Sequence, residues 1–199
     1  MIVALAGRRI DKPDAKTPAF PLENIGKVRA ELFSFLDKNS VTHLVSSGAC
    51  GADLLGLEVA IKLKISCHLI LPFEKEIFVA KSVSDCLENE MWEAMFKKSY
   101  TFLEENQDVT ILSISPEDED KYQKTNKAIL NKVESLSNSL KKTEEYLSSN
   151  SVPKKIALIL WEGKPKTKFK EDETVDYTEN ILDSAKAIGF EIEVINTLY

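Results

Sequence analysis

The chain has 199 residues, of which 43% are hydrophobic and 29% charged, proportions typical of a globular protein with a buried core. Its 32 acidic residues outnumber its 26 basic ones, and the net charge of −6 argues against a broad nucleic-acid-binding surface. The sequence has no apolar run near the ~20 residues of a membrane span, and its first residues do not resemble a cleaved signal peptide.

The chain begins with a continuous apolar run at residues 2–6, which predicts a parallel strand covered on both faces. Arg8 and Arg9 follow it, in a chain that has only three arginines. A guanidinium can bind a phosphate or carboxylate through two hydrogen bonds, which a lysine cannot do. We therefore predict one ligand-facing and one structural arginine. The alternative is that one arginine pairs with Asp11 or Asp14 and the other lies in solvent.

A helix is expected at residues 22–38, and a second strand at residues 42–45. After that strand comes the segment Ser46-Ser47-Gly48-Ala49-Cys50-Gly51-Ala52-Asp53, and then a helix with an apolar face that continues to about Lys64. Glycines at a helix N-terminus let an anion approach the free backbone N–H groups. The segment therefore predicts an anion-binding loop. The alternative is a tight strand-to-helix turn that binds nothing.

A third strand is expected at residues 66–71, directly before Pro72. Residues 74–105 are helical in pattern, with a break near 81–85. The break follows the carboxyl end of the third strand, the edge at which parallel sheets bind ligands. Ser82 and Asp85 are thus candidates to face the glycine-rich loop, although Ser-x-x-Asp is also a helix-capping pattern.

A long helix is predicted at residues 116–149, with an acidic first turn and apolar residues at heptad-like spacing from 122 to 147. We interpret residues 114–150 as a helical elaboration that packs on one neighbour or on a second copy of the chain. A homo-oligomer is therefore expected. Asn126 interrupts the stripe and is either a buried hydrogen-bonding residue or a ligand contact.

Further strands are predicted at residues 109–113, 155–161 and 191–195, and a further helix at 175–188. The alternation of strands and helices predicts an α/β fold, with a Rossmann-like, doubly wound and mainly parallel sheet of about six strands. We expect a single domain over residues 1–199.

The cysteines and histidines are few. Cys50, Cys67 and Cys86 are widely spaced, which favours reduced thiols in a cytoplasmic protein over a disulfide framework or a zinc site. Cys50 could gain thiolate character at a helix N-terminus, and the alternative is a packed small residue. With only two histidines in the chain, we expect neither a metal site nor a cofactor.

These motifs resemble the SLOG superfamily, which joins DNA-processing protein A relatives, cytokinin-activating phosphoribohydrolases and nucleotide-sensing domains of bacterial defence systems. Its members resemble a strand, then S-G-x-x-x-G-A-D or G-G-x-G-T, then a helix; this chain has S-G-x-x-G-A-D, one residue shorter than the first version. The matching segments are Gly7-Arg8-Arg9, residues 45–53, Phe78-x-x-x-Ser82-Val83-x-Asp85, Tyr122-x-x-Thr125-Asn126, Leu160-Trp161-Glu162-Gly163 and Tyr177-Thr178-Glu179-Asn180.

The resemblance implies a bacterial, cytoplasmic, defence-associated protein that binds a nucleotide or nucleotide-derived molecule across the carboxyl ends of the strands. The ligand-binding residues it implies, together with those predicted above, are Gly7, Arg8, Arg9, Ser47, Gly48, Ala49, Cys50, Gly51, Asp53, Pro72, Ser82, Asp85, Asn126, Trp161 and Thr178.

The resemblance does not supply a catalytic residue for this chain. The glutamate with which the phosphoribohydrolases act on the N-glycosidic bond falls at Leu55 of this chain, so Asp85 and Asp53 are the first catalytic candidates. Three functions stay open at this point. They are a small-molecule binding module, a nucleotide N-glycosidase or phosphoribohydrolase, and a single-stranded DNA-binding protein, of which the charge disfavours the last.

Overall fold

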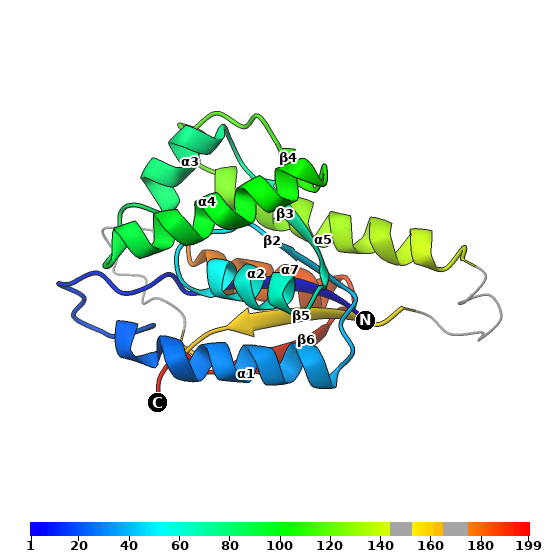
Figure 1. Ribbon diagram of the computed structural model, residues 1–199, viewed down its shortest axis with the longest axis horizontal. Coiled ribbons are helices and arrows are strands. Elements are labelled where there is room, and N and C mark those ends of the chain that lie inside the picture. The colour runs from blue at the N-terminus through cyan, green and yellow to red at the C-terminus, as the bar shows by residue number, and fades with distance from the viewer. Residues whose placement is uncertain (144–152, 165–174) are drawn as a thin grey trace.

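A computed structural model describes residues 1–143, 153–164 and 175–199 (Figure 1). Six parallel strands form one sheet in the order β4-β3-β2-β1-β5-β6. The strands are β1 (Ile2–Gly7), β2 (His43–Ser46), β3 (Ser66–Leu71), β4 (Val109–Ile111), β5 (Lys155–Leu160) and β6 (Glu191–Ile195). The predicted Rossmann-like, doubly wound α/β fold is confirmed.

Helices cover both faces of this sheet, as a parallel sheet requires. The helices are α1 (Ile25–Lys38), α2 (Ala52–Lys62), α3 (Lys75–Ser82), α4 (Asn89–Glu105), α5 (Lys121–Leu140) and α7 (Tyr177–Ala187), and a short 3-10 turn at Leu22–Asn24 leads into α1. One core lies between the sheet and α1, α2 and α4, and includes Leu5, Leu55 and Trp92. The other lies beneath α5 and α7 and includes Ala4, Ile129 and Ile181.

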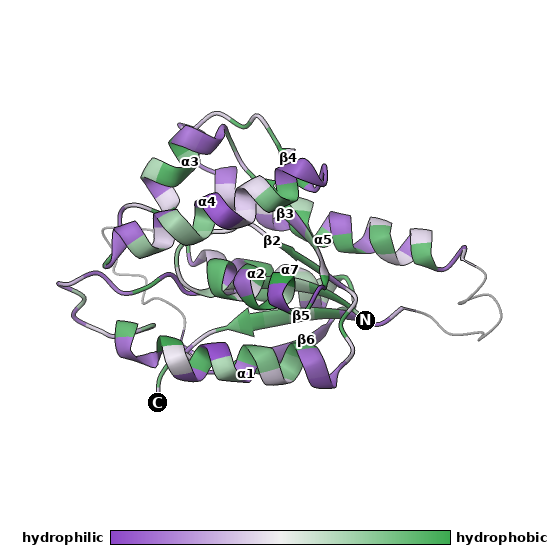
Figure 2. Cartoon of the chain, in the orientation of Figure 1, coloured by the Kyte–Doolittle hydropathy of each residue, from purple (hydrophilic) through white to green (hydrophobic). Residues whose placement is uncertain are grey.

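The hydropathy of each element reflects how much of it is buried. β5 is apolar after its first residue, Lys155, because both of its faces are covered (Figure 2). Most residues of α2 are buried, and most of them are apolar. The helices α1, α4 and α5 alternate between apolar and polar residues, because one side of each faces solvent (Figure 2). Trp92 and Phe96, which are four residues apart on α4, are both buried in the core.

The helix predicted at 116–149 differs in its start and in its packing. It begins at Lys121, because Asp118 accepts the backbone N–H of Asp120 in a turn that holds the acidic residues outside the helix. Residues 121–140 form a crossover helix that packs on β1, β2, β3, β5 and α7, rather than on one neighbour. Its last turns extend past the amino ends of the strands (Figure 1). Residues 144–149 lie outside the described part of the chain.

The direction of winding reverses next to β1. The chain goes from β1 through α1 to β2 on one side, whereas α5 returns it to β5 on the other side of β1. The carboxyl ends of β1 and β5 therefore flank the point at which open α/β sheets bind ligands. Arg8 and Arg9 follow β1 at this edge, and Trp161 follows β5.

Candidate functional site

Arg8 is the structural arginine of the pair. Its side chain is 3% exposed and lies at the switch point between β1 and β5. Its Nε and Nη2 donate to both carboxylate oxygens of Glu162 at 2.7 and 2.8 Å, and its Nη1 donates to Asp176 Oδ1 at 2.7 Å. Nη2 also donates to the Lys164 carbonyl, and the Trp161 ring lies 5.7 Å from the guanidinium carbon. These contacts occupy Arg8 within the protein.

Arg9 makes a more open cluster on the other side of the same edge. Its side chain is 36% exposed and pairs with both carboxylate oxygens of Asp85, which is exposed to a similar degree. Its Nε and Nη2 each lie 3.3 Å from Cys50 Sγ. The expected alternative partners, Asp11 and Asp14, are not those of either arginine. Instead, Asp11 accepts backbone N–H groups of its own loop.

The glycine-rich loop uses several of its amides internally. Ala49 N donates to Asp53 Oδ2 at 3.3 Å, and Cys50 N donates to the Ser82 carbonyl at 2.9 Å. Ala52 N donates to the Arg8 carbonyl at 3.1 Å. An anion bound at these amides would compete with acceptors that the protein already supplies.

The two glycines of this loop are required by its backbone and its packing. Gly48 and Gly51 have φ of +80° and +96°, a region that other residues rarely adopt. A Cβ added at Gly51 would lie 2.7 Å from the Arg8 carbonyl oxygen, and one added at Gly48 would lie 2.9 Å from Leu69 Cδ1. The glycines thus fit a tight strand-to-helix turn irrespective of any ligand.

Asp53 is a buried carboxyl without an arginine partner. It lies in the first turn of α2 and accepts the Ser47 hydroxyl at 2.5 Å. Its Oδ1 has no hydrogen-bond partner among the residues that the structure describes. Burial raises the pKa of Asp53 to about 6, although the hydrogen bonds from Ser47 and Ala49 lower it.

Polar and aromatic side chains approach this edge from α5 and α7. The Tyr122 and Tyr177 rings are in edge-to-face contact at 5.0 Å, and the Tyr122 hydroxyl lies 3.3 Å from Ser82 Oγ. Asn126 donates to the Tyr177 carbonyl and to Asn180 Oδ1, so its amide joins α5 to α7. These bonds match the hydrogen-bonding role, which was one of the two roles considered for Asn126 from its place in the apolar stripe of the helix.

The start of α7 is already capped by a carboxylate. Asp176 Oδ1 accepts the backbone N–H groups of Thr178 and Glu179, and the same oxygen accepts from Arg8. Thr178 is buried. A phosphate bound here, as the resemblance implies, would have to displace Asp176 from both the helix and the guanidinium.

The contacts at the carboxyl edge form a closed series, which we call the edge ring. In order of contact or chain adjacency, it runs through Arg8, Asp176, Tyr177, Tyr122, Ser82, Cys50 and Arg9. Beside it, Ala6 and Gly7 at the end of β1 are partly exposed, whereas Ile2–Leu5 of the same strand are buried. Ser47 and Ala49 at the end of β2 are partly exposed as well. Solvent therefore reaches small residues at the ends of both central strands.

Most of the predicted site residues come together at this edge, with one exception and two omissions. Pro72 is buried at the end of β3, and its carbonyl accepts from Ile114 outside the edge ring. Glu162 and Asp176 were not predicted as site residues, although they are the ion-pair partners of Arg8. An aspartate at the start of a helical pattern is a capping signal, and it could have identified Asp176, although the helix was predicted to begin one residue earlier, at 175.

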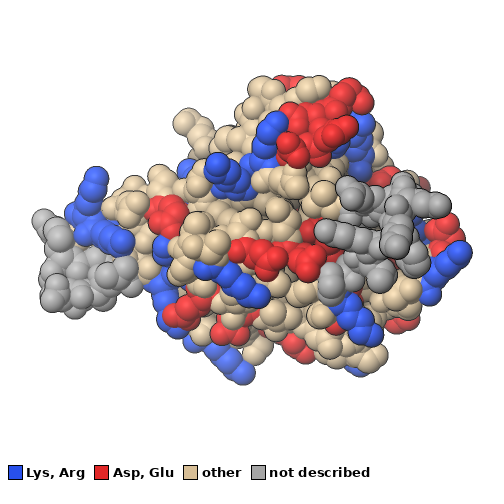
Figure 3. Space-filling view, turned by 180° about the vertical axis from the view of Figure 1, so that it is seen from behind, with Lys and Arg blue, Asp and Glu red and all other residues tan. Residues whose placement is uncertain are grey.

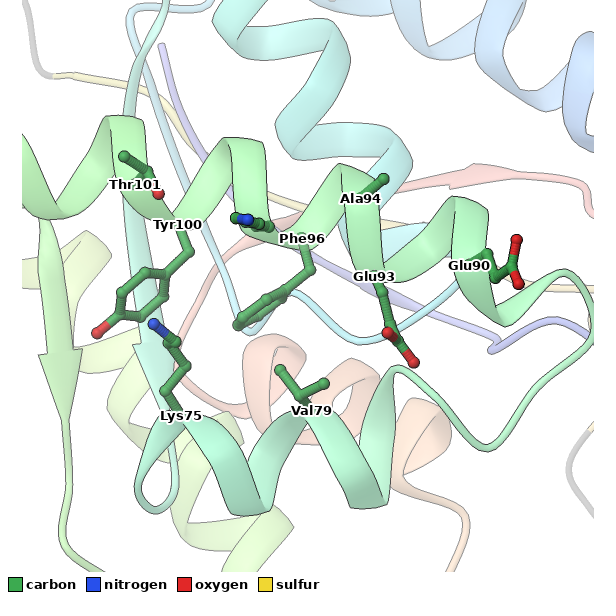
Figure 4. A pocket seen from close by; sticks show the side chains of 9 residues that line it. Lys75, Val79, Glu90, Glu93, Ala94, Phe96, Tyr100 and Thr101 are labelled. Atoms are coloured by element: carbon green, nitrogen blue, oxygen red, sulfur yellow. The ribbon is translucent and has the colours of Figure 1, made fainter.

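A separate groove of about 500 Å³ lies between α3 and α4 (Figure 4). Lys75 extends over the Tyr100 ring at 4.6 Å, and Val79 and Phe96 contribute apolar surface. Glu90, Glu93 and Lys97 add charge to its sides. Among the described residues that line the groove, none belongs to the predicted site.

Within the described ranges, no three or more His, Cys, Asp or Glu side chains are placed to hold a metal ion. Likewise, none of the helices described has the length and apolar character needed to cross a membrane.

No known family model matches the chain, and no curated protein is significantly similar to it.

Proposed function

We propose that this protein binds a small nucleotide or nucleotide-derived molecule at the carboxyl edge of its sheet. The observation that carries the proposal is the partly exposed Arg9 guanidinium, next to solvent-reachable small residues at the switch point of a doubly wound sheet. Arg9 supplies positive charge for a phosphate, because Asp85, its exposed partner, can be exchanged for a ligand oxygen at little cost.

Aromatic rings at the same edge suit the other half of such a ligand. Tyr122, Tyr177 and Trp161 are each only partly buried. A flat base can stack on an aromatic ring, and a stacked base contributes about 1–3 kcal/mol in nucleic-acid complexes. A guanidinium and aromatic rings along one edge thus match the two ends of a nucleotide.

The resemblance to SLOG proteins supports the same proposal. It adds the hypotheses of a bacterial cytoplasmic protein, a homo-oligomer, and a sensing or sequestering role in defence-associated signalling. Single-stranded DNA binding is not favoured. On the face that Figure 3 shows, acidic and basic side chains of the described residues are interspersed, without the continuous basic surface that tracks a nucleic-acid backbone.

Hydrolysis of the N-glycosidic bond is a second candidate, and one observation favours it. Asp53 is a carboxyl whose pKa of about 6 suits proton transfer near neutral pH. Its hydrogen bond to the partly exposed Ser47 connects it to the ends of the central strands. Asp85, the other catalytic candidate from the sequence, also lies at this edge, although its carboxylate is engaged by Arg9.

Native mass spectrometry with ATP, AMP, NAD and ADP-ribose tests both candidates. We expect at least one compound to bind intact and to raise the melting temperature, since a ligand at 100 times its Kd stabilises the folded state by about 2.7 kcal/mol. Arg9→Gln should weaken binding at least tenfold, whereas Arg29→Gln on α1 should leave it unchanged. Release of free base, lost in Asp53→Asn, would instead establish hydrolysis. If no compound binds, or if the two arginine variants behave alike, the binding proposal is wrong.

A further inference from the structure

Two of the three thiols meet beside Arg9, at a place that small-molecule binding does not explain. Cys50 lies in the glycine-rich loop, and Cys86 lies in the connection between α3 and α4. Arg9 contacts the Cys50 sulfur and pairs with Asp85, the residue before Cys86, so the two side chains adjoin, and both are free thiols. Cys67, the third, is buried in β3 and donates to the Ile65 carbonyl.

Cys50 is held in an environment that stabilises a thiolate. Two guanidinium nitrogens of Arg9 lie 3.3 Å from its sulfur. The hydrogen bond from Cys86 and the positive charge of Arg9 lower the pKa of Cys50 to about 7, in spite of its burial. The same contact with Cys50, together with burial, raises the pKa of Cys86. The negative charge is thus favoured on Cys50, whereas Cys86 keeps its proton, which its Sγ donates to the Val83 carbonyl at 2.9 Å.

Cys67 provides the contrast within the same chain. Burial raises the pKa of Cys67 to about 12, and the negative charge of Asp108 acts in the same direction. It therefore stays a thiol at neutral pH. The thiolate is the reactive form of cysteine, so the fold separates one reactive thiol from an inert one.

We propose that Cys50 and Cys86 are a redox-active pair, in which hydrogen peroxide converts the two thiols into a reversible intramolecular disulfide. The Cys50 thiolate attacks one peroxide oxygen, the O–O bond breaks, and hydroxide leaves. The resulting sulfenic acid is attacked by the Cys86 sulfur, which releases water as the S–S bond forms. Peroxide gains the two electrons that the thiols lose. The Cys86 proton joins the hydroxyl group of the sulfenic acid, and the two leave as water.

The surroundings of the pair suit both steps. Cys50 itself is 1% exposed, but Arg9 and Cys86, which contact its sulfur, are both partly exposed to solvent. The positive charge of Arg9, 3.3 Å from the sulfur, also stabilises the hydroxide that leaves. Cys86 lies in an irregular connection between two helices, where its backbone can adjust to the geometry of a disulfide.

The test is peptide mapping of the intact chain after treatment with peroxide. We expect a loss of about two mass units, a peptide pair that joins Cys50 to Cys86, and full reversal by dithiothreitol. Cys67→Ser should form the same link, whereas Cys50→Ser and Cys86→Ser should not. In the wild-type protein, alkylation should lose Cys50 and Cys86 together and leave Cys67 unaffected, which gives a readout that needs no variant.

A pH profile separates the role of Arg9 from simple proximity of the thiols. Arg9→Gln should form the link roughly tenfold more slowly at pH 7 and approach the wild-type rate near pH 9, where an ordinary thiol ionises unaided. A link that includes Cys67, a disulfide between two chains, or oxidation of Cys50 to sulfinic acid without a link would each overturn the proposal. None of these readouts depends on a nucleotide, so the proposal stands or fails independently of ligand binding.

Discussion

Two neighbouring arginines at one edge of the sheet have opposite surroundings. Arg8 is buried and makes four hydrogen bonds, three of them to carboxylates that come from beyond β5. Arg9 is about one-third exposed and lies between a carboxylate and a sulfur. The first joins β1, β5 and α7, whereas the second has partners that can be exchanged. Only a group of the second kind can act on a ligand or a nearby thiol without loss of the fold.

Removal of Arg8 should have the largest effect on stability. Arg8→Ala takes the guanidinium away from the buried carboxylates of Glu162 and Asp176, and we expect a loss of about 3–5 kcal/mol in the free energy of unfolding. Arg9→Ala removes a partly exposed pair and should cost about 1 kcal/mol. Urea denaturation measures both. Arg29→Ala, which breaks a partly exposed pair with Glu58, is the control and should likewise cost about 1 kcal/mol or less. Equal losses in the first two variants would contradict the comparison.

Asp53 extends the comparison to a buried acid that has no arginine partner. Its pKa is raised in the folded protein, so its contribution to stability is greatest at low pH and is lost as the pH rises from about 4 to about 7. The shift from 3.8 to about 6 corresponds to about 3 kcal/mol. Asp53→Asn should remove this dependence, as measured by urea denaturation across that pH range.

Asp37→Asn, at the exposed end of α1, is the matched control and should keep the wild-type dependence. A wild-type protein whose stability does not fall over this interval, relative to Asp53→Asn, would show that Asp53 is ionised without cost. It would then be unsuited to proton transfer, and the hydrolytic candidate would lose its support.

Gly7 shows how closely the Arg8 region is packed. An added Cβ would lie 2.5 Å from the Leu160 carbonyl oxygen and 2.7 Å from Ala52 Cβ, so Gly7→Ala should cost about 1–3 kcal/mol. The control is Gly26→Ala in the first turn of α1, where no atom lies within 4 Å of the added carbon. That variant should be neutral or more stable by up to about 1 kcal/mol. A neutral Gly7→Ala would show that β1 and α2 can separate readily.

The strands could be predicted because they are local patterns. A strand buried on both faces is a continuous apolar run, and β3 was predicted with both of its ends correct. The start of α5 was misplaced because acidic residues favour a helix N-terminus as well as the turn before it. Only the side-chain bonds of Asp118 distinguish the two.

The site could be predicted in position but not in its pairing. Parallel strands bring their carboxyl ends to one edge, so Arg9, Cys50 and Asp85 were expected near one another. The partners of Arg8 are 154 and 168 residues away, and no local pattern indicates which acid a buried arginine selects. The contact of Cys50 with Cys86 depends on an irregular connection, whose path hydrophobic periodicity does not predict.

The amino edge of the sheet provides the smallest effect and a contrast in sign. His43 and His68 stack there with ring centroids 6.3 Å apart, and His68 Nδ1 lies 3.1 Å from Asp108 Oδ1. Burial lowers the pKa of both histidines, and the positive charge of Lys132 acts in the same direction. The negative charge of Asp108 raises both pKa values in part. The positive charge of the chain's amino terminus lowers the pKa of His43 further.

Because the folded protein favours the neutral rings, the histidine pair should lose stability as the pH falls below 6.5, which is opposite to Asp53. The two dependences partly cancel in the wild-type protein, so the measurement belongs in the Asp53→Asn background. There, stability should decline from pH 7 to pH 5, and adding His43→Gln and His68→Gln should reduce that decline. An unchanged decline would assign the acid sensitivity to other groups, and the carboxyl edge would then be the main source of the protein's pH dependence.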